Sequence, residues 1–142
     1  MGRDASFTPM AIKTVTPYLN FDGTARDAIT LYEKALGAKS EGVMPFEKDP
    51  NRVMHARVQL GGGLIMISDT QPGMPLVQGS NAHVTLDYDY SDVGEMRRAF
   101  DALAEGGKVT MPLQDTFWGA TFGMLTDRYG INWMFNATKA PG

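Results

Sequence analysis

PYLNFDGTARDAITLYEKALGAK, residues 17–39, begins like a strand, continues like a helix and stops at a glycine. We expect the strand over residues 14–21, although Pro17 weakens it as a central strand. Thr24 and Asp27 resemble a capping box, and Gly37 predicts the end of the helix. The apolar side chains that recur at helical spacing are Ala25, Ala28, Ile29, Tyr32 and Leu36. Strand-like runs at 39–46, 53–60 and 64–68 follow, so the unit is β-α-β-β-β.

The same order of elements returns about 67 to 70 residues later. A strand is predicted over 82–88, Ser91 is expected to cap the next helix, and three strands follow at 108–111, 121–126 and 131–136. The apolar face of this helix consists of Val93, Met96, Phe100, Leu103 and Ala104. The sequence therefore predicts one α+β domain over residues 14–138, built from modules 14–69 and 81–136, with residues 1–13 as a flexible lead-in.

Composition narrows the classes of function. The 142 residues suffice for one domain with its own core, and the absence of cysteine excludes disulfides and thiolate chemistry. Thirteen basic and 16 acidic residues give a net charge of −3, with neither sign in a run, which argues against binding to nucleic acid or a membrane surface. No apolar run or leader pattern indicates a membrane span or secretion, so a cytoplasmic protein with a small-molecule partner is expected.

Several stretches in order carry a resemblance to a known family, namely PYLNFDGTARDAITLYEKALGAK, VMHARVQLGGGLIMISD, KVTMPLQDTFWGATFG and TDRYGINWMFN. Together they resemble the PhnB-like branch of the vicinal oxygen chelate superfamily, which includes glyoxalase I, bleomycin-resistance proteins and extradiol dioxygenases. The resemblance implies that two βαβββ modules form a partly open eight-stranded mixed β-barrel, with helices outside and a ligand cavity inside. It also implies a homodimer. Because this fold carries unrelated chemistries, function has to be argued from the site.

Relatives that use a metal place a His or Gln, a Glu, a His or Gln, and a second Glu on the first, fourth, fifth and eighth strands. The resemblance puts His83 in the position on the fifth strand. The other three positions fall on Thr16 or Pro17, Met66 or Ile67, and Met134 or Trp133. None of these side chains is a useful ligand for a catalytic divalent ion. We therefore expect no bound metal and no other cofactor.

The candidate site residues are predicted on three grounds, namely the alternation of side chains along strands, the aromatic residues near Gly119, and the resemblance to the family. His55 alternates with Arg57 and Gln59 on one face of its strand, and could border a cavity or face water. The segment around Gly119 combines aromatic side chains with glycines, so Trp118 could line a pocket or plug the barrel as core. Methionine suits variable apolar ligands because its side chain is soft and flexible. The candidate ligand-binding residues are His83, His55, Trp118, Phe117, Met66 and Met134.

Three functions stay open at this point, and whether any reaction is catalysed is one of the open questions. The first is a protein that binds a small apolar or aromatic molecule in the barrel cavity without a catalytic metal. The second is a metal-dependent lyase or dioxygenase of the superfamily, whose ligand set either lies at other positions than those matched above or is completed by a second chain. The third is a structural or interaction protein with a residual cavity. The sequence contains no motif of a serine nucleophile that would add a fourth function. The glycines at 61–63 form no phosphate-binding loop, because they separate two predicted strands and do not open a helix.

Overall fold

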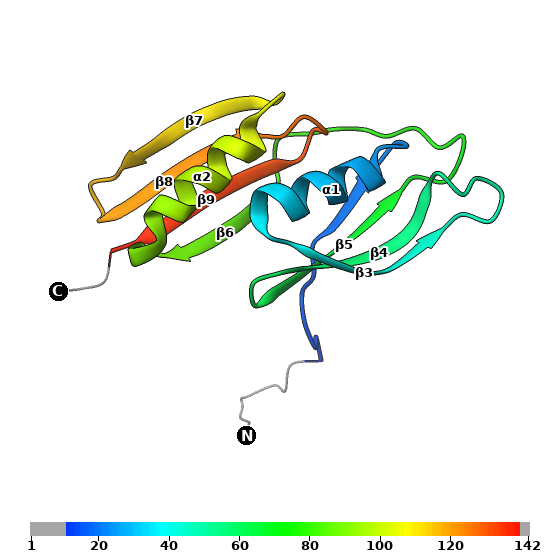
Figure 1. The fold of residues 1–142 in the computed structure, drawn as a ribbon, viewed down its shortest axis with the longest axis horizontal. Helices are drawn as coiled ribbons and strands as arrows, with labels where there is room; N and C mark the ends of the chain where they lie inside the picture. The colour runs from blue at the N-terminus through cyan, green and yellow to red at the C-terminus, as the bar shows by residue number, and fades with distance from the viewer. Residues whose placement is uncertain (1–10, 140–142) are drawn as a thin grey trace, which may run out of the picture.

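The computed structural model of the protein describes residues 11–139. The predicted repeat is confirmed, because two successive β-α-β-β-β units make up the domain (Figure 1). The first consists of β2 (Tyr18–Phe21), α1 (Ala25–Leu36), β3 (Lys39–Pro45), β4 (Val53–Leu60) and β5 (Gly63–Asp69). The second consists of β6 (Val84–Asp89), the one-turn 3-10 helix η1 (Tyr90–Asp92), α2 (Val93–Ala104), β7 (Lys108–Asp115), β8 (Ala120–Thr126) and β9 (Asn132–Thr138). Most of the predicted lead-in, residues 1–10 of 1–13, lies outside the described residues.

The two modules build two mixed four-stranded sheets with the same topology. Their strand orders are β2-β5-β4-β3 and β6-β9-β8-β7. In each sheet the first strand pairs in parallel with the last, and the other neighbours are antiparallel. Within the described residues no ladder joins the two sheets, so the arrangement agrees with the predicted partly open barrel.

Each helix lies across one face of its own sheet, and the two helices lie side by side on the same side of the molecule (Figure 1). Alternation along the strands explains which residues face them, since successive side chains point to opposite faces. The paired core positions Leu19 and Ile67 belong to the helix side in the first sheet. Trp133 and Phe135, two positions apart on β9, share one face of the strand and are both fully buried. Neither helix of the described segment is long and apolar enough to cross a membrane.

The predicted first strand is too long. The observed strand, β2, begins at Tyr18 and not at Thr14, because Pro17 has no N–H to donate to a ladder. The Pro17 carbonyl still accepts a hydrogen bond from the Met66 backbone N–H at 3.0 Å, so the parallel register starts there. The proline therefore marks the point at which the chain joins the sheet.

Both predicted helix caps are wrong. Thr24 makes no side-chain cap, and the Ala25 backbone N–H donates instead to Oδ1 of Asp69, 3.0 Å away at the end of β5. The second oxygen of this buried carboxylate accepts from the Val53 backbone N–H at 2.8 Å. Ser91 lies inside η1, and α2 starts after Asp92 without a side-chain cap. At α1 a carboxylate from a distant strand thus supplies the acceptor that local capping would provide.

Candidate functional site

The open face of each sheet, meaning the face turned away from its helix, carries half-exposed side chains. In the first sheet Tyr18 lies beside Met66, and Met66 lies beside Arg57. The Tyr18 hydroxyl lies 3.3 Å from Nδ1 of His55, and the two ring centroids are 6.0 Å apart. Tyr18 remains 48 % exposed. This face therefore offers an aromatic ring and a thioether next to an imidazole, groups that suit a flat ligand with a polar edge.

In the second sheet Met134 lies between Thr85 of β6 and Met124 of β8. The Thr85 hydroxyl donates to the Met134 sulfur at 3.7 Å. One step further along the same face Asn136 lies between Asp87 and Phe122, and its amide donates to the Asp87 carboxylate at 3.0 Å. Met134 thus occupies the position in the second module that Met66 occupies in the first.

The aromatic turn between β7 and β8 lies at the end of the second sheet. Phe117 is 97 % exposed and Trp118 is 58 % exposed, and their rings meet edge to face at 5.0 Å. Trp118 also contacts Phe122 at a centroid distance of 6.4 Å. Gly119 adopts a positive φ of 83°, which the tight turn requires. Trp118 is therefore no plug of the core within one chain, because more than half of its surface meets solvent.

A cleft of about 420 Å³ opens at the junction of the two modules, and we call it the junction cleft. It is formed by β2, by the linker that leads into β6, and by the turn between β8 and β9. Tyr18 and His83 both line it, which brings a predicted site residue of the second module next to the open face of the first. The lining residues are 17–20, 76–79, 81–84 and 129–132. Its volume lies within the usual range of small-molecule sites.

Asn132 holds the linker wall of the junction cleft in place. Its side-chain amide donates to the carbonyl of Gly79 at 2.8 Å and to that of Ala82 at 3.2 Å. Its Oδ1 accepts from the Thr126 hydroxyl at 2.8 Å. The carboxamide of Gln78 lies over Gly130, where an added Cβ would come within 2.5 Å of Nε2. The linker is thus fastened to the β8–β9 turn by one asparagine and one glycine.

The β8–β9 turn is itself fixed by a buried carboxylate, Asp127, which is 3 % exposed. Its Oδ1 accepts from the backbone N–H groups of Tyr129 at 2.8 Å and Ile131 at 3.1 Å. Its Oδ2 accepts from the Tyr32 hydroxyl at 2.6 Å and from the Trp133 indole N–H at 2.9 Å. Since Tyr32 belongs to α1, this carboxylate connects the first module to the wall of the junction cleft.

The environment of Tyr32 keeps its hydroxyl protonated. Burial raises the pKa of Tyr32 far above its ordinary value, and the adjacent Asp127 carboxylate raises it further. The pKa of Tyr88, which is partly buried beside Phe135, is also raised, first by burial and then by the charge of Glu95. Tyr32 therefore acts as a permanent hydrogen-bond donor, which suits a structural role.

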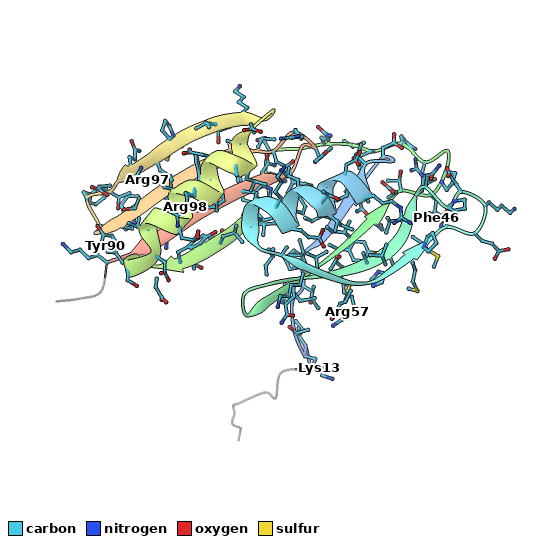
Figure 2. The ribbon with its side chains drawn as sticks, in the orientation of Figure 1. Lys13, Phe46, Arg57, Tyr90, Arg97 and Arg98 are labelled. Atoms are coloured by element: carbon cyan, nitrogen blue, oxygen red, sulfur yellow. The ribbon has the colours of Figure 1, made fainter. Side chains whose placement is uncertain are left out.

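The side chains that pair across the parallel ladders on the two open faces are poor ligands for a divalent ion. The paired open-face positions hold Tyr18 and Met66 in one module and Thr85 and Met134 in the other. Residues 11–139 contain no group of three His, Cys, Asp or Glu side chains that could hold a metal ion. Figure 2 also shows that Arg57 on the first sheet lies apart from Arg97 and Arg98 on α2, so these cations form no common anion site.

The structure brings only part of the predicted site together. His83 lines the junction cleft with Tyr18, and Tyr18 contacts His55 and pairs with Met66. His55 and Met66 do not themselves line the junction cleft. Met134 lies on the other open face, and Phe117 and Trp118 lie at its end, so His83 is the only one of the six predicted residues, all of them described, that lines this cleft. The sequence interpretation missed Tyr18 and Asn132. Tyr18 could have been found from its alternation with Leu19 and Phe21, which face the core.

A second cleft, of about 610 Å³, lies between the β4–β5 turn and β6, and we call it the acidic cleft. Leucines at positions 36, 60, 64 and 86 line it together with the carboxylates of Asp87, Asp89 and Asp92. Asp87 and Asp89 are both exposed. The two clefts therefore differ in charge although both lie between the modules.

Residues 15–135 match the family model described as the Glyoxalase/Bleomycin resistance protein/Dioxygenase superfamily. The chain is 38 % identical to the protein YjdN of Escherichia coli over 143 aligned positions, which cover 88 % of this chain and 95 % of YjdN. Among solved structures, it resembles PA1353 of Pseudomonas aeruginosa, with 40 % identity, a TM-score of 0.78, and coverage of 87 % of this chain and 96 % of PA1353. A PhnB protein of Bacillus cereus has the same fold, with 22 % identity, a TM-score of 0.77, and coverage of 89 % and 100 %.

Proposed function

Because the chain belongs to the Glyoxalase/Bleomycin resistance protein/Dioxygenase superfamily, we propose that it binds a small apolar or aromatic molecule in its cavity, without a catalytic metal. The observation that carries this proposal is the half-exposed Tyr18. It lines the junction cleft together with His83, and it contacts His55 and pairs with Met66 on the open face of the first sheet. A flat ligand could stack on the ring and place its polar edge toward the imidazoles.

The donor set supports a site without metal. Met66 and Met134 lie at positions that the resemblance matches to the two carboxylates of relatives that use a metal, and a thioether is a poor ligand for a hard or borderline divalent ion. The alternative function, a metal-dependent lyase or dioxygenase, would therefore need carboxylates from a second chain. Elemental analysis after dialysis separates the two functions, because near-stoichiometric metal that is lost in His83→Ala would favour the enzyme.

We also propose that two copies of the chain form the working unit. Phe117 and Trp118 expose large aromatic surfaces at one turn, and β3 and β7 are open edges of their sheets within the described residues. Within one chain these aromatic residues lie outside the junction cleft. Their proposed contact with ligand, together with that of Met134, is therefore assigned to a cavity that a second copy closes.

A thermal-shift screen of small aromatic and aliphatic compounds, carried out with chelator present, tests the proposed function. We expect hits that raise the melting temperature of the wild type, and a loss of most of this shift in His83→Ala and Tyr18→Ala. Tyr90→Ala is the matched control, because Tyr90 is also a half-exposed tyrosine but lies outside the junction cleft. If no compound shifts the wild type, or if Tyr90→Ala loses the shift equally, binding at this site is refuted and the structural role is favoured.

A further inference from the structure

The junction cleft differs from an ordinary surface groove in its charge. Among the described residues that line it, none is Asp, Glu, Lys or Arg. This contrasts with a chain in which charged residues make up 20 %, and with the acidic cleft, where three carboxylates line the wall. A charged ligand would lose hydration in the junction cleft and would meet no opposite charge there.

The same wall is rich in neutral hydrogen-bonding groups. Asn20, Gln78 and Asn81 present carboxamides, and His83 presents an imidazole. Within the described residues Gln78, Asn81 and His83 make no side-chain hydrogen bond, whereas Asn132 has all three of its bonds directed to the protein. Oδ1 of Asn20 also accepts from the Ser68 hydroxyl at 3.1 Å, so the wall separates into two amides bonded to the protein and two carboxamides, Gln78 and Asn81, that can face a ligand. Each carboxamide offers both a donor and an acceptor.

The remainder of the wall is apolar. Leu76, Val77 and Ile131 lie between the amides, and the ring of Tyr18 adds an aromatic surface. Apolar walls with a few neutral polar groups favour a ligand that has an apolar body and a polar edge able to donate and accept. A purely apolar ligand would bury the carboxamides without replacing their bonds to water, which costs free energy for each group.

From these three observations we propose that the junction cleft selects an uncharged molecule with an apolar body and an amide-like edge that both donates and accepts hydrogen bonds. This inference rests on the proposed small-molecule function and assigns its ligand class. The carboxamides of Gln78 and Asn81 pair with the ligand's amide-like edge, and the Tyr18 ring covers its flat face. Asn132 positions the linker that carries these carboxamides.

Four probes of nearly the same shape test the ligand class, namely benzamide, benzoate, benzamidinium and toluene. Backbone amide resonances of isotope-labelled protein, followed by NMR during titration, report both affinity and location. We expect benzamide to shift resonances of residues 76–84 and 129–132, with a dissociation constant on the order of millimolar for so small a probe. Benzoate, benzamidinium and toluene should bind there about tenfold more weakly.

Two variants verify that the probes occupy the junction cleft. Val77 is 88 % exposed in this cleft, so Val77→Asp introduces a carboxylate without disturbing the core. It should raise the affinity for benzamidinium about threefold and leave that for benzamide nearly unchanged. Val15, which is 85 % exposed and lines the acidic cleft, provides the control, since Val15→Asp should leave binding at the junction cleft unchanged.

The outcomes separate this inference from the proposed function. If benzoate or benzamidinium binds the junction cleft as tightly as benzamide, the ligand class is wrong although a small-molecule site remains. If the amide resonances that shift belong to residues around Met134 or Phe122, or if no probe binds, the junction cleft is not the site that selects the ligand. The thermal-shift screen tests the proposed function independently. A compound of any charge would support that function if its binding depends on His83.

Discussion

Removing the carboxylate of Asp127 should destabilise the whole domain, although this residue lies in a turn. Asp127 is 3 % exposed and accepts four hydrogen bonds, two from the backbone of its own turn and two from side chains. The side-chain donors belong to Tyr32 and Trp133, both of which are fully buried. Asp127→Ala would leave both donors without an acceptor and without access to water.

The expected size of the effect follows from these two donors. A buried donor that loses its acceptor costs about 1–3 kcal/mol, so two of them cost roughly 4 kcal/mol in free energy of unfolding. The N–H groups of Tyr129 and Ile131 add less, because these residues are only partly buried and water can reach the turn. Since domains are stable by about 5–15 kcal/mol, the variant should keep only a marginal stability.

Urea denaturation followed by fluorescence measures this change, and Asp115→Ala is the matched control. Asp115 is exposed and accepts one hydrogen bond from the buried Thr121 hydroxyl at 2.9 Å, so its loss removes the acceptor of one donor in place of two and should cost about 1–2 kcal/mol. Should Asp127→Ala not fold, Tyr32→Phe removes one donor from the same network and is expected to cost about 1–2 kcal/mol. A loss in Asp127→Ala no larger than in Asp115→Ala, or an unaffected Tyr32→Phe, would refute the reasoning.

Three further predictions concern pH, packing and assembly. The free energy of unfolding should fall as the pH rises above about 10, because the raised pKa of Tyr32 means that only the unfolded state releases the phenol proton in this range. The expected slope is about 1.4 kcal/mol per pH unit. In Tyr32→Phe the urea midpoint should lose most of this dependence on pH. An unchanged slope in that variant contradicts the assignment. In the same urea assay Trp133→Ala should lower the free energy of unfolding by about 3–5 kcal/mol. Trp118→Ala truncates a ring that is 58 % exposed and should lower it by about 1 kcal/mol. Equal losses would contradict the assignment of Trp118 to the surface. Light scattering at micromolar concentration should give twice the chain mass of 15.5 kDa, and a monomer mass would remove the proposed shared cavity.

The elements were predictable because their signals are local. The helical spacing of Ala25 to Leu36 and the glycine at position 37, which adopts a left-handed conformation, define α1 almost to the residue. Side chains alternate along β9, and this alternation places Trp133 and Phe135 together on its buried face. A repeat of these signals at nearly constant offset is enough to predict two equal modules.

The contacts that hold the modules together were not predictable, because they join residues far apart in the sequence. Asp69 caps a helix that begins 44 positions earlier, and Asp127 accepts from a tyrosine 95 positions earlier. In the sequence both carboxylates look like ordinary turn residues. For the same reason the junction cleft could not be derived, since its wall depends on the linker that Asn132 fastens from β9.

The central claim is a metal-free small-molecule site at the junction of the modules, and isothermal titration of a screened ligand tests it most directly. The titration compares untreated wild type, chelator-treated wild type and His83→Ala. We predict the same affinity before and after chelation, and an affinity lower by about tenfold or more in His83→Ala, as expected for the loss of a hydrogen bond in a partly buried site. Binding that disappears with the chelator, or that is indifferent to His83, would contradict the claim.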